Sequence, residues 1–265
     1  MKRMKNEIEI PERLVFFEGC TTSRALPETR LATYIILEKA VKNGIIKEYK
    51  TIPNERCCGY ASMVRGDFKT QRDNLIFNLN AISRMGIPDV LFTCGACTQF
   101  LGNSPEFKRR GFRSINIIEF LYALSKTGDL EKLIDKKLPN DNKITGHYSC
   151  HLRRLCGIKM EELYREIADA LGVRYVEMKD ATECCGAGSE GEIGIKIAER
   201  KVENAENSGA DIVPLACAGC EAVLTVASKQ HNAKVKFISL SSLIAICFDD
   251  LDIWIDKLSG RKLQK

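Results

Sequence analysis

Long apolar segments and a secretory signal are absent from the sequence. The longest nearly apolar stretch, residues 237–248, contains three serines and is far shorter than the roughly 18 residues that a transmembrane helix needs. The first residues, 1–7, do not lead into the apolar segment that a signal peptide requires. We therefore expect a cytoplasmic protein with no transmembrane segment.

The sequence also has little net charge. Its 265 residues include 40 Lys and Arg against 35 Asp and Glu, which gives a formal net charge of +5. This mildly basic balance lacks the strong asymmetry typical of proteins that bind nucleic acid or membrane surfaces, so we expect no nucleic-acid partner. With 45% hydrophobic and 28% charged residues, the chain has a globular composition, which excludes a disordered or fibrous protein.

No segment has the context of a nicotinamide- or flavin-binding fingerprint. Residues 186–191 satisfy G-x-G-x-x-G, but they follow two adjacent cysteines instead of a strand. A dinucleotide fingerprint lies in the first turn between a strand and its helix, so we reject that function for these glycines. Electrons used by this chain must therefore come from a partner.

Cysteine, by contrast, is abundant and regularly placed. The chain has 12 cysteines, about 4.5% of its residues and fewer than the roughly 8–10% of a secreted disulfide scaffold. In a reducing cytosol, cysteines are retained for metal binding or redox chemistry. Ten of them form two copies of one pattern: a single cysteine, an adjacent pair, then C-x-x-C. The first copy is Cys20, Cys57, Cys58, Cys94 and Cys97, and the second is Cys150, Cys184, Cys185, Cys217 and Cys220.

The two copies indicate an internal duplication. Equivalent cysteines are 130, 127 and 123 residues apart, so only short deletions separate the halves. A glycine stands eight residues before each C-x-x-C motif, at Gly86 and at Gly209, and an apolar run separates each glycine from its motif. Residues 138–143 are polar and have linker composition. We predict an N-terminal domain of residues 1–142 and a C-terminal domain of residues 143–265.

Strands and helices are expected to alternate in each half. This alternation predicts an α/β fold of two similar, pseudo-twofold-related domains, each a small parallel sheet flanked by helices. Cys20, Cys94, Cys150 and Cys217 fall at the carboxyl ends of strands, where ligands gather in such sheets, so five cysteines converge in each half. The predicted strands are 15–18, 49–52, 90–93, 144–149, 174–178 and 212–216, and the predicted helices are 27–42, 129–137, 160–171, 192–207 and 251–265.

Five converging thiolates favour an iron–sulfur cluster. Soft thiolate ligands select zinc, copper(I) or iron–sulfur clusters. A structural zinc ion takes four ligands, usually from two short paired motifs, whereas each set here offers five from three segments. The side chains of adjacent cysteines diverge, so each pair fits a body with several metal atoms better than one ion. Structural zinc and free buried thiols are the alternatives.

Several stretches resemble the B-subunit family of heterodisulfide reductases, whose members carry a duplicated cysteine-rich CCG domain. Each C-C-G motif, at Cys57-Cys58-Gly59 and Cys184-Cys185-Gly186, has a cysteine upstream and a C-x-x-C downstream. Residues 19–28, 147–152 and 184–188 also resemble family segments, and the similarity covers residues 15–240. The resemblance implies two noncubane 4Fe-4S clusters that face each other across the domain interface. By this resemblance, each cysteine set would hold one cluster.

The same resemblance implies an activity and partners. The chain would be the catalytic subunit of a heterodisulfide reductase-like complex, a disulfide oxidoreductase that reduces or forms a small-molecule or lipoyl-type disulfide between its two clusters. Its partners would be a ferredoxin-like 4Fe-4S subunit and a flavin subunit. The alternative is an electron-transfer or cluster-scaffold subunit of a quinone-linked or succinate-, lactate- or glycolate-type oxidoreductase. A zinc protein without redox activity is a third hypothesis.

Other residues near the cysteines are candidates for supporting roles. His147 and His151 flank Cys150, and we favour hydrogen bonding or proton supply over ligation for them, with His151 preferred as the proton donor to a leaving thiolate. Arg24 either binds an anionic thiol cofactor or belongs to a solvated basic face, as do Arg153 and Arg154. The remaining candidates are Gly59, Gly186 and Gly188, which would let the backbone approach a cluster, and Cys156 and Cys247, which are expected to be structural.

Overall fold

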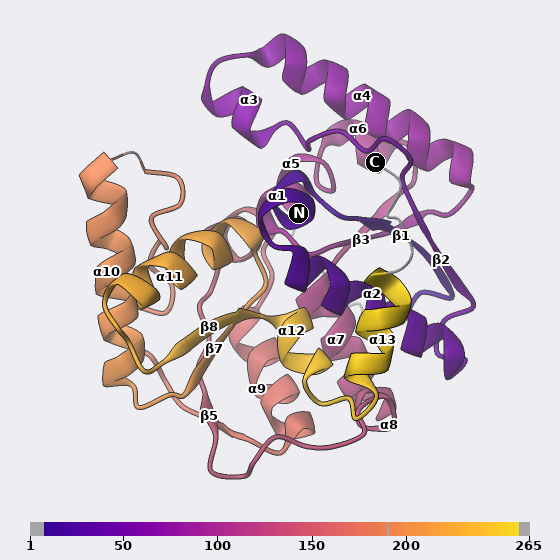
Figure 1. Cartoon of the computed structure of the whole chain (residues 1–265). Coiled ribbons are helices and arrows are strands. Elements are labelled where there is room, and N and C mark those ends of the chain that lie inside the picture. The colour runs from indigo at the N-terminus through magenta and orange to yellow at the C-terminus, as the bar shows by residue number, and fades with distance from the viewer. Residues whose placement is uncertain (1–7, 190, 260–265) are drawn as a thin grey trace.

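Two parallel four-stranded sheets form the centre of the protein (Figure 1). The structure is a computed structural model, and it describes residues 8–189 and 191–259. The strand order is 2-1-3-4 in both halves, so the duplication seen in the cysteines extends to the topology. The first sheet runs β2 (Glu48–Thr51), β1 (Arg13–Phe17), β3 (Asp89–Phe92) and β4 (Arg113–Asn116), and the second runs β6 (Arg174–Tyr175), β5 (Lys143–Ile144), β7 (Ile212–Leu215) and β8 (Lys236–Ser239).

Helices connect the strands and cover the sheets. The helices of the first half are α1 (Cys20–Ala25), α2 (Pro27–Lys42), α3 (Tyr60–Val64), α4 (Phe68–Met85), α5 (Gly95–Phe100), α6 (Pro105–Arg109), α7 (Ile117–Lys126) and α8 (Asp129–Leu133). Those of the second half are the π-helix η1 (His151–Leu155), α9 (Met160–Leu171), α10 (Gly191–Asn207), α11 (Ala218–Gln230), α12 (Leu240–Ala245) and α13 (Leu251–Ser259). This alternation confirms the predicted α/β class.

The local sequence accounts for the main elements. Strand β7 is apolar and fully buried along its length, as expected of a parallel strand covered on both faces. Pro27 occupies the first turn of α2, where its missing N–H costs nothing. Asn116 and Glu119 form a reciprocal capping box at the start of α7. Helix α4 ends at Gly86, whose φ of 66° is the left-handed conformation that glycine adopts most easily.

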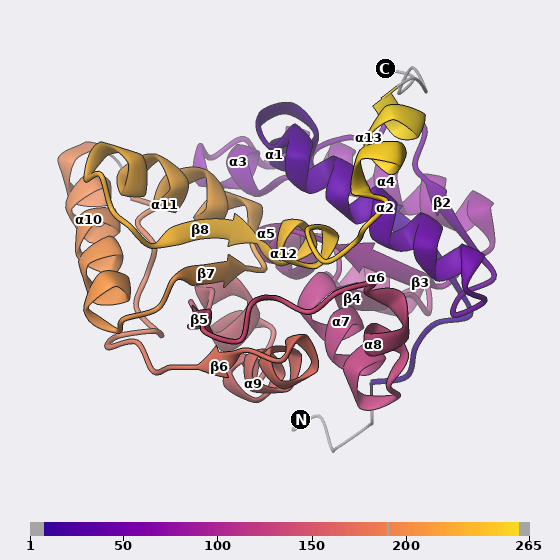
Figure 2. The ribbon, with the colours of Figure 1, turned by 60° about the horizontal axis from the view of Figure 1, so that its bottom comes forward.

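The two halves pack on each other reciprocally. Helix α7 of the first half packs on α9 of the second, and α12 of the second packs on α2 of the first (Figure 2). Helices α2 and α9 follow the first strand of their halves, and α7 and α12 follow the fourth, so these are equivalent contacts. The contacts of α5 with η1 and of α11 with α1 form a second equivalent pair. This is the pattern that a pseudo-twofold relation produces.

Several predicted bounds are corrected by the structure. The expected strand 144–149 pairs in the sheet only at Lys143–Ile144, because Tyr148 N–H donates to the Ala181 carbonyl and so directs this segment toward the loop that precedes Cys184. The expected strand 174–178 stops at Tyr175, and the expected helix 129–137 ends at Leu133. Part of the predicted helix 251–265, residues 260–265, lies outside the described residues.

Two further expectations concern the whole chain. The predicted domain boundary between residues 142 and 143 stays a prediction, although β5 begins at Lys143. Within the described part of the chain, the structure contains no helix that is both long enough and apolar enough to span a membrane.

Candidate metal centre

The five cysteines of the first half lie where strands end and helices begin. Cys20 opens α1, three residues after β1 ends at Phe17. Cys94 is the N-cap of α5, two residues after β3 ends at Phe92, and Cys97 lies in the first turn of that helix. The pair Cys57 and Cys58 lies in the loop between β2 and α3. The prediction that cysteines lie at the carboxyl ends of parallel strands is therefore correct in this half.

The second half repeats this order of elements, although Cys150 stands six residues after β5 ends at Ile144. Cys150 precedes η1, and the pair Cys184 and Cys185 lies in the loop between β6 and α10. Cys217 follows β7 as the N-cap of α11, with Cys220 in the first turn of the helix. Equivalent cysteines thus occupy equivalent places in the two topologies.

Within the first half, the thiols form a chain of contacts. The Cys20 thiol donates to the Sγ atom of Cys57 over 3.4 Å. Two thiolates on one tetrahedral metal with bonds of about 2.3 Å would lie about 3.8 Å apart, so this spacing suits shared metal. Cys58 is in hydrogen-bond contact with the thiols of Cys57 and Cys97, and Cys97 is also in contact with Cys94.

The second half has a corresponding chain. Cys185 is in hydrogen-bond contact with Cys184 and Cys220, and Cys220 is in contact with Cys217. Cys150 lies near enough to Cys185 and Cys217 that their negative charge raises its pKa, although burial contributes more to that rise.

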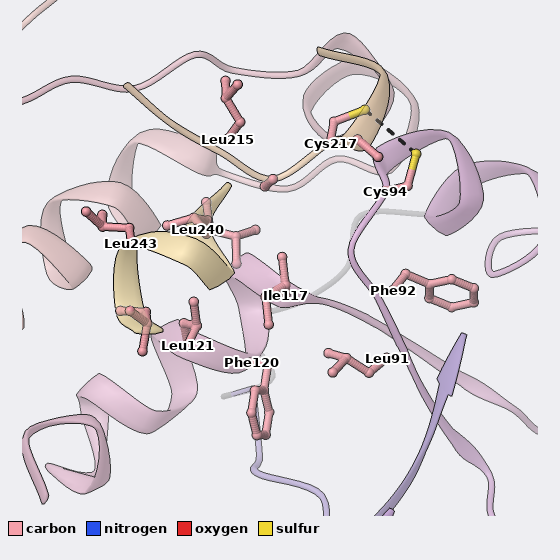
Figure 3. Packing of buried hydrophobic residues seen from close by; sticks show 14 of the residues in the cluster. Leu91, Phe92, Cys94, Ile117, Phe120, Leu121, Leu215, Cys217, Leu240 and Leu243 are labelled. Atoms are coloured by element: carbon pink, nitrogen blue, oxygen red, sulfur yellow. Dashed lines mark hydrogen bonds between the residues drawn. The ribbon is translucent and has the colours of Figure 1, made fainter. Parts of the chain in front are cut away.

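The two sets meet at Cys94 and Cys217. Their Sγ atoms are 4.0 Å apart, and both residues are buried (Figure 3). The two residues are equivalent cysteines, so the meeting point lies where a pseudo-twofold axis would pass. Leu240 and Leu243 of α12 lie in the same apolar core as Ile117 of α7 (Figure 3). Each is at most 1% exposed, and burying such a side chain contributes roughly 2 kcal/mol, so the core holds the halves together beside the thiols.

The thiols divide into those that lose and those that keep a proton. Hydrogen-bond contacts from Cys20 and Cys58 lower the pKa of Cys57 to about 2. Contact with Cys57 raises the pKa of Cys58, and contact with Cys217 raises that of Cys94 to about 12. A buried thiolate is stable here only where a neighbour donates to it. Ten thiolates together would need a multiply charged metal group to balance them, so the donor set fits such a group.

Glycines bring the backbone close to the thiols. A Cβ atom at Gly19 would lie 3.2 Å from Cys97 Sγ, and one at Gly95 would lie 3.3 Å from Cys217 Sγ. The backbone N–H of Gly186 donates to Cys184 Sγ over 3.3 Å. The backbone at Gly186 therefore lies against a cysteine sulfur.

The other predicted glycines shape the loops instead. Gly59 has a φ of 96°, and a Cβ atom there would lie 2.8 Å from the side chain of Gln71. A Cβ atom at Gly188 would lie 3.3 Å from the hydroxyl of Tyr60, a residue of the first half. Gly188 therefore lies where the two halves approach each other.

The two candidate histidines occupy different environments. His151 is half-buried at the interface, where its ring lies edge-on to Tyr60 at 5.2 Å and its Nδ1 bonds with Gln99. His147 is 1% exposed, and one of its ring nitrogens lies within 4.8 Å of Cys185 Sγ and Cys220 Sγ. Neither nitrogen of His147 makes a hydrogen bond of normal geometry among residues 8–189 and 191–259, and contacts from Cys184, Cys220 and His147 lower the pKa of Cys185. His147 therefore lies against the second cysteine set.

Arg24 lies on the exposed side of α1 beside a large cavity. The cavity has a volume of about 1880 Å³, and its lining includes Cys20, Cys57, the basic residues Arg24, Arg56 and Arg65, and the acidic residues Glu18, Glu38 and Glu55. Of the ten patterned cysteines, Cys20 and Cys57 line the cavity. The first set is therefore the one that faces this cavity.

Two carboxylates near the cysteines, the half-buried Glu55 and the buried Glu221, were not foreseen from the sequence. Glu55 accepts the backbone N–H groups of Glu18 and Gly19, at 2.9 and 2.8 Å, which fixes the turn before Cys20, and burial raises its pKa to about 8. Glu221 follows Cys220 and accepts the hydroxyl of Thr29 from the other half. The position of Glu221 directly after the second C-x-x-C motif was the feature of the sequence that could have indicated its role.

The two leftover cysteines, Cys156 and Cys247, have different surroundings. Cys247 is fully buried in an apolar setting, as predicted. Cys156 ends η1, and its Sγ atom accepts a hydrogen bond from the side-chain amide of Asn103 over 3.0 Å. These placements agree with structural roles for both.

Fold and site together define a duplicated, cysteine-rich α/β protein whose thiols gather where its halves meet. Residues 14–102 and 144–225 match the CCG family, described as a cysteine-rich domain. The chain belongs to this family, and the predicted duplication is confirmed by the two matched segments.

Proteins with similar sequences include components of redox complexes. The chain is 28% identical over 251 residues to the D subunit of dihydromethanophenazine:CoB--CoM heterodisulfide reductase from Methanosarcina acetivorans, covering 88% of this chain and 58% of the relative. It is 27% identical to the B subunit of the ferredoxin/F(420)H(2)-dependent CoB-CoM heterodisulfide reductase from the same organism, covering 78% of each. It is 26% identical to lactate utilization protein A of Lysinibacillus sphaericus, covering 62% of this chain and 75% of the relative. The predicted resemblance to heterodisulfide reductase subunits is confirmed, and the chain spans just over half the length of the first of these relatives.

Proposed function

We propose that the protein is an iron–sulfur subunit of a heterodisulfide reductase-like complex that reduces or forms a small-molecule or lipoyl-type disulfide. The observation that carries this proposal is the 4.0 Å approach of Cys94 and Cys217, equivalent members of two five-thiol sets. Two equivalent redox sites side by side suit a reaction in which the two sulfurs of one substrate separate. The similarity to the B and D subunits of heterodisulfide reductases supports the same function.

In this proposal each set holds one noncubane 4Fe-4S cluster. When bound, the two clusters supply one-electron redox chemistry and iron sites for thiolate sulfur. Splitting a disulfide takes two electrons and two protons and yields two thiols. The electrons come from a ferredoxin-like 4Fe-4S subunit, which is itself supplied by a flavin subunit. The ligands are Cys20, Cys57, Cys58, Cys94 and Cys97 in the first half, and Cys150, Cys184, Cys185, Cys217 and Cys220 in the second.

His151 supplies a proton to a leaving thiolate in this proposal. Its ring lies between the halves, packed against Tyr60 and Phe100 of the first half, although its own backbone belongs to the second. The contact between its Nδ1 and Gln99 fixes the orientation of the ring. A histidine held at this interface is placed to serve substrate sulfur on either side.

Arg24 recognises an anionic substrate that enters through the cavity beside the first set. The cavity also contains Arg56 and Arg65, and its volume of about 1880 Å³ exceeds the roughly 300–1,000 Å³ of typical small-molecule sites, so it admits a long, charged disulfide. A guanidinium forms charge-assisted hydrogen bonds with carboxylate or phosphate, each worth about 1.5–3 kcal/mol.

Substrate turnover by the isolated chain tests this function. Cluster-loaded protein is assayed anaerobically with reduced methyl viologen and either the CoB-CoM heterodisulfide or oxidised lipoamide. We expect Arg24→Ala to raise KM for the anionic heterodisulfide about tenfold, equivalent to about 1.4 kcal/mol, and to leave KM for neutral lipoamide unchanged. Arg84→Ala, which changes an exposed arginine of α4 outside the cavity, is the matched control and should change neither.

The second candidate function is an electron-transfer or cluster-scaffold subunit. The similarity to lactate utilization protein A favours it, because the name of that relative refers to lactate and not to a disulfide. The same cysteines would then hold clusters that pass electrons to a carrier. Cluster-loaded protein that accepts electrons from the dye but turns over neither disulfide would support this function and contradict the first.

A further inference from the structure

The segment that enters the second cysteine set carries buried polar groups without partners. Thr145, His147 and Ser149 are each at most 1% exposed. Within residues 8–189 and 191–259, neither the Thr145 hydroxyl nor the Ser149 hydroxyl has a hydrogen-bond partner. The ring of His147 makes no hydrogen bond of normal geometry there, although it lies close enough to Cys185 to help lower the pKa of that thiol. Buried polar groups in folded proteins are almost always hydrogen-bonded, so those of His147 and Ser149, which adjoin the second cysteine set, point to an acceptor that is not part of the polypeptide.

Two of the three groups lie beside second-set sulfurs. A ring nitrogen of His147 lies within 4.8 Å of Cys185 Sγ and Cys220 Sγ. A Cβ atom at Gly95 would lie 3.0 Å from Ser149 Oγ and 3.3 Å from Cys217 Sγ, so these two atoms are at most 6.3 Å apart. The donors therefore face the place where the second set would hold its group.

The first half lacks these donors. The 130-residue offset between Cys20 and Cys150 makes Phe17 equivalent to His147 and Gly19 equivalent to Ser149. The Phe17 side chain is fully buried and packs on Phe92, with ring centroids 5.4 Å apart. At this position the two halves therefore differ, with an apolar environment in the first and a polar one in the second.

The sheet registers agree with this alignment. In the first half Val15 pairs with Val90, which places Leu14 opposite Asp89. In the second half Ile144 pairs with Ile212, the residues equivalent to Leu14 and Asp89 under the offsets of 130 and 123. The equivalence of Phe17 and His147 thus rests on backbone pairing as well as on the cysteine spacing.

We propose that His147 and Ser149 donate hydrogen bonds to sulfur atoms of the second cluster and raise its reduction potential, so that the duplicated clusters are electronically unequal. The inference rests on the proposed function, in which each set holds an iron–sulfur cluster. A hydrogen bond to sulfur stabilises the negative charge that reduction adds, and hydrogen bonds to sulfur are among the factors that set cluster potentials. Phe17 and Gly19 offer the first cluster no such bond at the equivalent positions, where the first set has instead a contact between the Thr21 side chain and the Cys20 thiol.

Redox titration of the full chain tests this inference. Anaerobically prepared protein is titrated under EPR detection, and the midpoint potentials of its two clusters are compared among variants. We expect His147→Leu to lower one midpoint enough to change the one-electron equilibrium at least tenfold, which is 59 mV, and to leave the other unchanged. Ser149→Ala should lower the same midpoint, and His147→Gln, which retains an N–H donor, should restore most of it.

Two variants serve as matched controls. Phe17→Leu changes the residue of the first half that is equivalent to His147. Thr145→Val removes an unpartnered hydroxyl from the start of the same segment. The backbone N–H of Thr145 donates to the carbonyl of Ile212, which is five residues before Cys217. Neither should lower the midpoint that responds to His147→Leu. If His147→Leu does not retain its clusters, a second measurement uses a chain that keeps His147. This chain carries ¹⁵N-labelled histidine and the substitution His151→Asn, which removes the other histidine beside Cys150. We then expect a ¹⁵N coupling to one cluster spin in pulsed EPR.

The outcomes separate this inference from the function on which it rests. Protein without iron and acid-labile sulfide would overturn the proposed function. Two intact clusters whose midpoints are unmoved by His147→Leu and Ser149→Ala would overturn the inference alone. A labelled chain with clusters but no histidine coupling would overturn it as well.

Discussion

The hydrogen bond between Thr29 and Glu221 joins the two halves directly beside the second cysteine set. Thr29 lies on α2 and is 2% exposed, and its Oγ1 donates to Oε1 of Glu221 over 2.6 Å. Glu221 is 8% exposed and follows Cys220 on α11. Burial raises the pKa of Glu221 to about 7. We predict that Thr29→Val, which keeps the shape of the side chain but removes the donor, loosens this junction in a pH-dependent manner.

The expected loss depends on the charge of Glu221. A hydrogen bond to a charged group contributes about 1.5–3 kcal/mol, and one to a neutral group contributes about 1 kcal/mol. Because the folded pKa exceeds the ordinary value of 4.5, Glu221 contributes less to stability as pH rises from 4.5 to about 7. The Thr29 hydroxyl lowers the pKa of folded Glu221, so removing it raises that pKa further and increases the loss of stability at high pH. Thr29→Val should therefore cost about 2 kcal/mol at pH 8 and about 1 kcal/mol at pH 5.5.

Anaerobic thermal unfolding at the two pH values measures this difference. For a chain of this size, about 2 kcal/mol lowers Tm by about 4 °C or more, so the variant should lose roughly twice as much at pH 8 as at pH 5.5. Glu221→Gln removes the charge, and in that background Thr29→Val should cost about 1 kcal/mol at both pH values. Equal losses at both pH values in the chain that retains Glu221 would refute the reasoning.

Three further predictions concern the ligands, the loop after the second cysteine pair and the C-terminal helix. Cys185→Ser should about halve the iron content per chain, and a full iron content would remove Cys185 from the ligand set. Gly186→Ala should lower the free energy of unfolding by about 2 kcal/mol or more, because its φ is 89° and a Cβ atom would lie 2.3 Å from a backbone oxygen of α10. The control Gly209→Ala, at a φ of 70° with open space around it, should cost only about 1 kcal/mol. Equal costs for the two variants would contradict the prediction. Lys39→Met should lower the free energy of unfolding by about 2 kcal/mol and speed proteolysis at α13. Lys39 Nζ lies 2.8 Å from carboxylate oxygens of Asp135 and of Asp250, the residue before α13. An unchanged rate of proteolysis would show that these ion pairs do not hold the helix.

The sequence patterns predicted the elements that short-range physics determines. Helix α2 has the predicted bounds because Pro27 opens it and its apolar residues recur at helical spacing. Cys97 and Cys220 lie in the first turns of helices because each C-x-x-C follows a buried strand. The duplication was visible because cysteine spacing survives where other residues diverge.

Contacts between the halves were beyond such patterns. The meeting of Cys94 with Cys217 depends on how two sheets and four helices pack, which no local window encodes. The strand expected at 144–149 leaves the sheet after Ile144, because its backbone bonds to the loop before Cys184.

The histidines show a similar limit. His147 and His151 both flank Cys150, and the preference for His151 as proton donor stays a prediction. Only the three-dimensional structure distinguishes the fully buried His147, beside two second-set sulfurs, from the half-buried His151, which bonds with Gln99. Burial and side-chain direction depend on the packing of distant segments, so flanking position alone could not separate the two.

The central claim is that each half of the chain holds one 4Fe-4S cluster on five cysteines. Iron, acid-labile sulfide and zinc determined per chain in anaerobically prepared protein test it most directly. We expect about eight iron atoms and about eight sulfides per chain, with no stoichiometric zinc. Zinc in place of iron, or iron without sulfide, would contradict the claim.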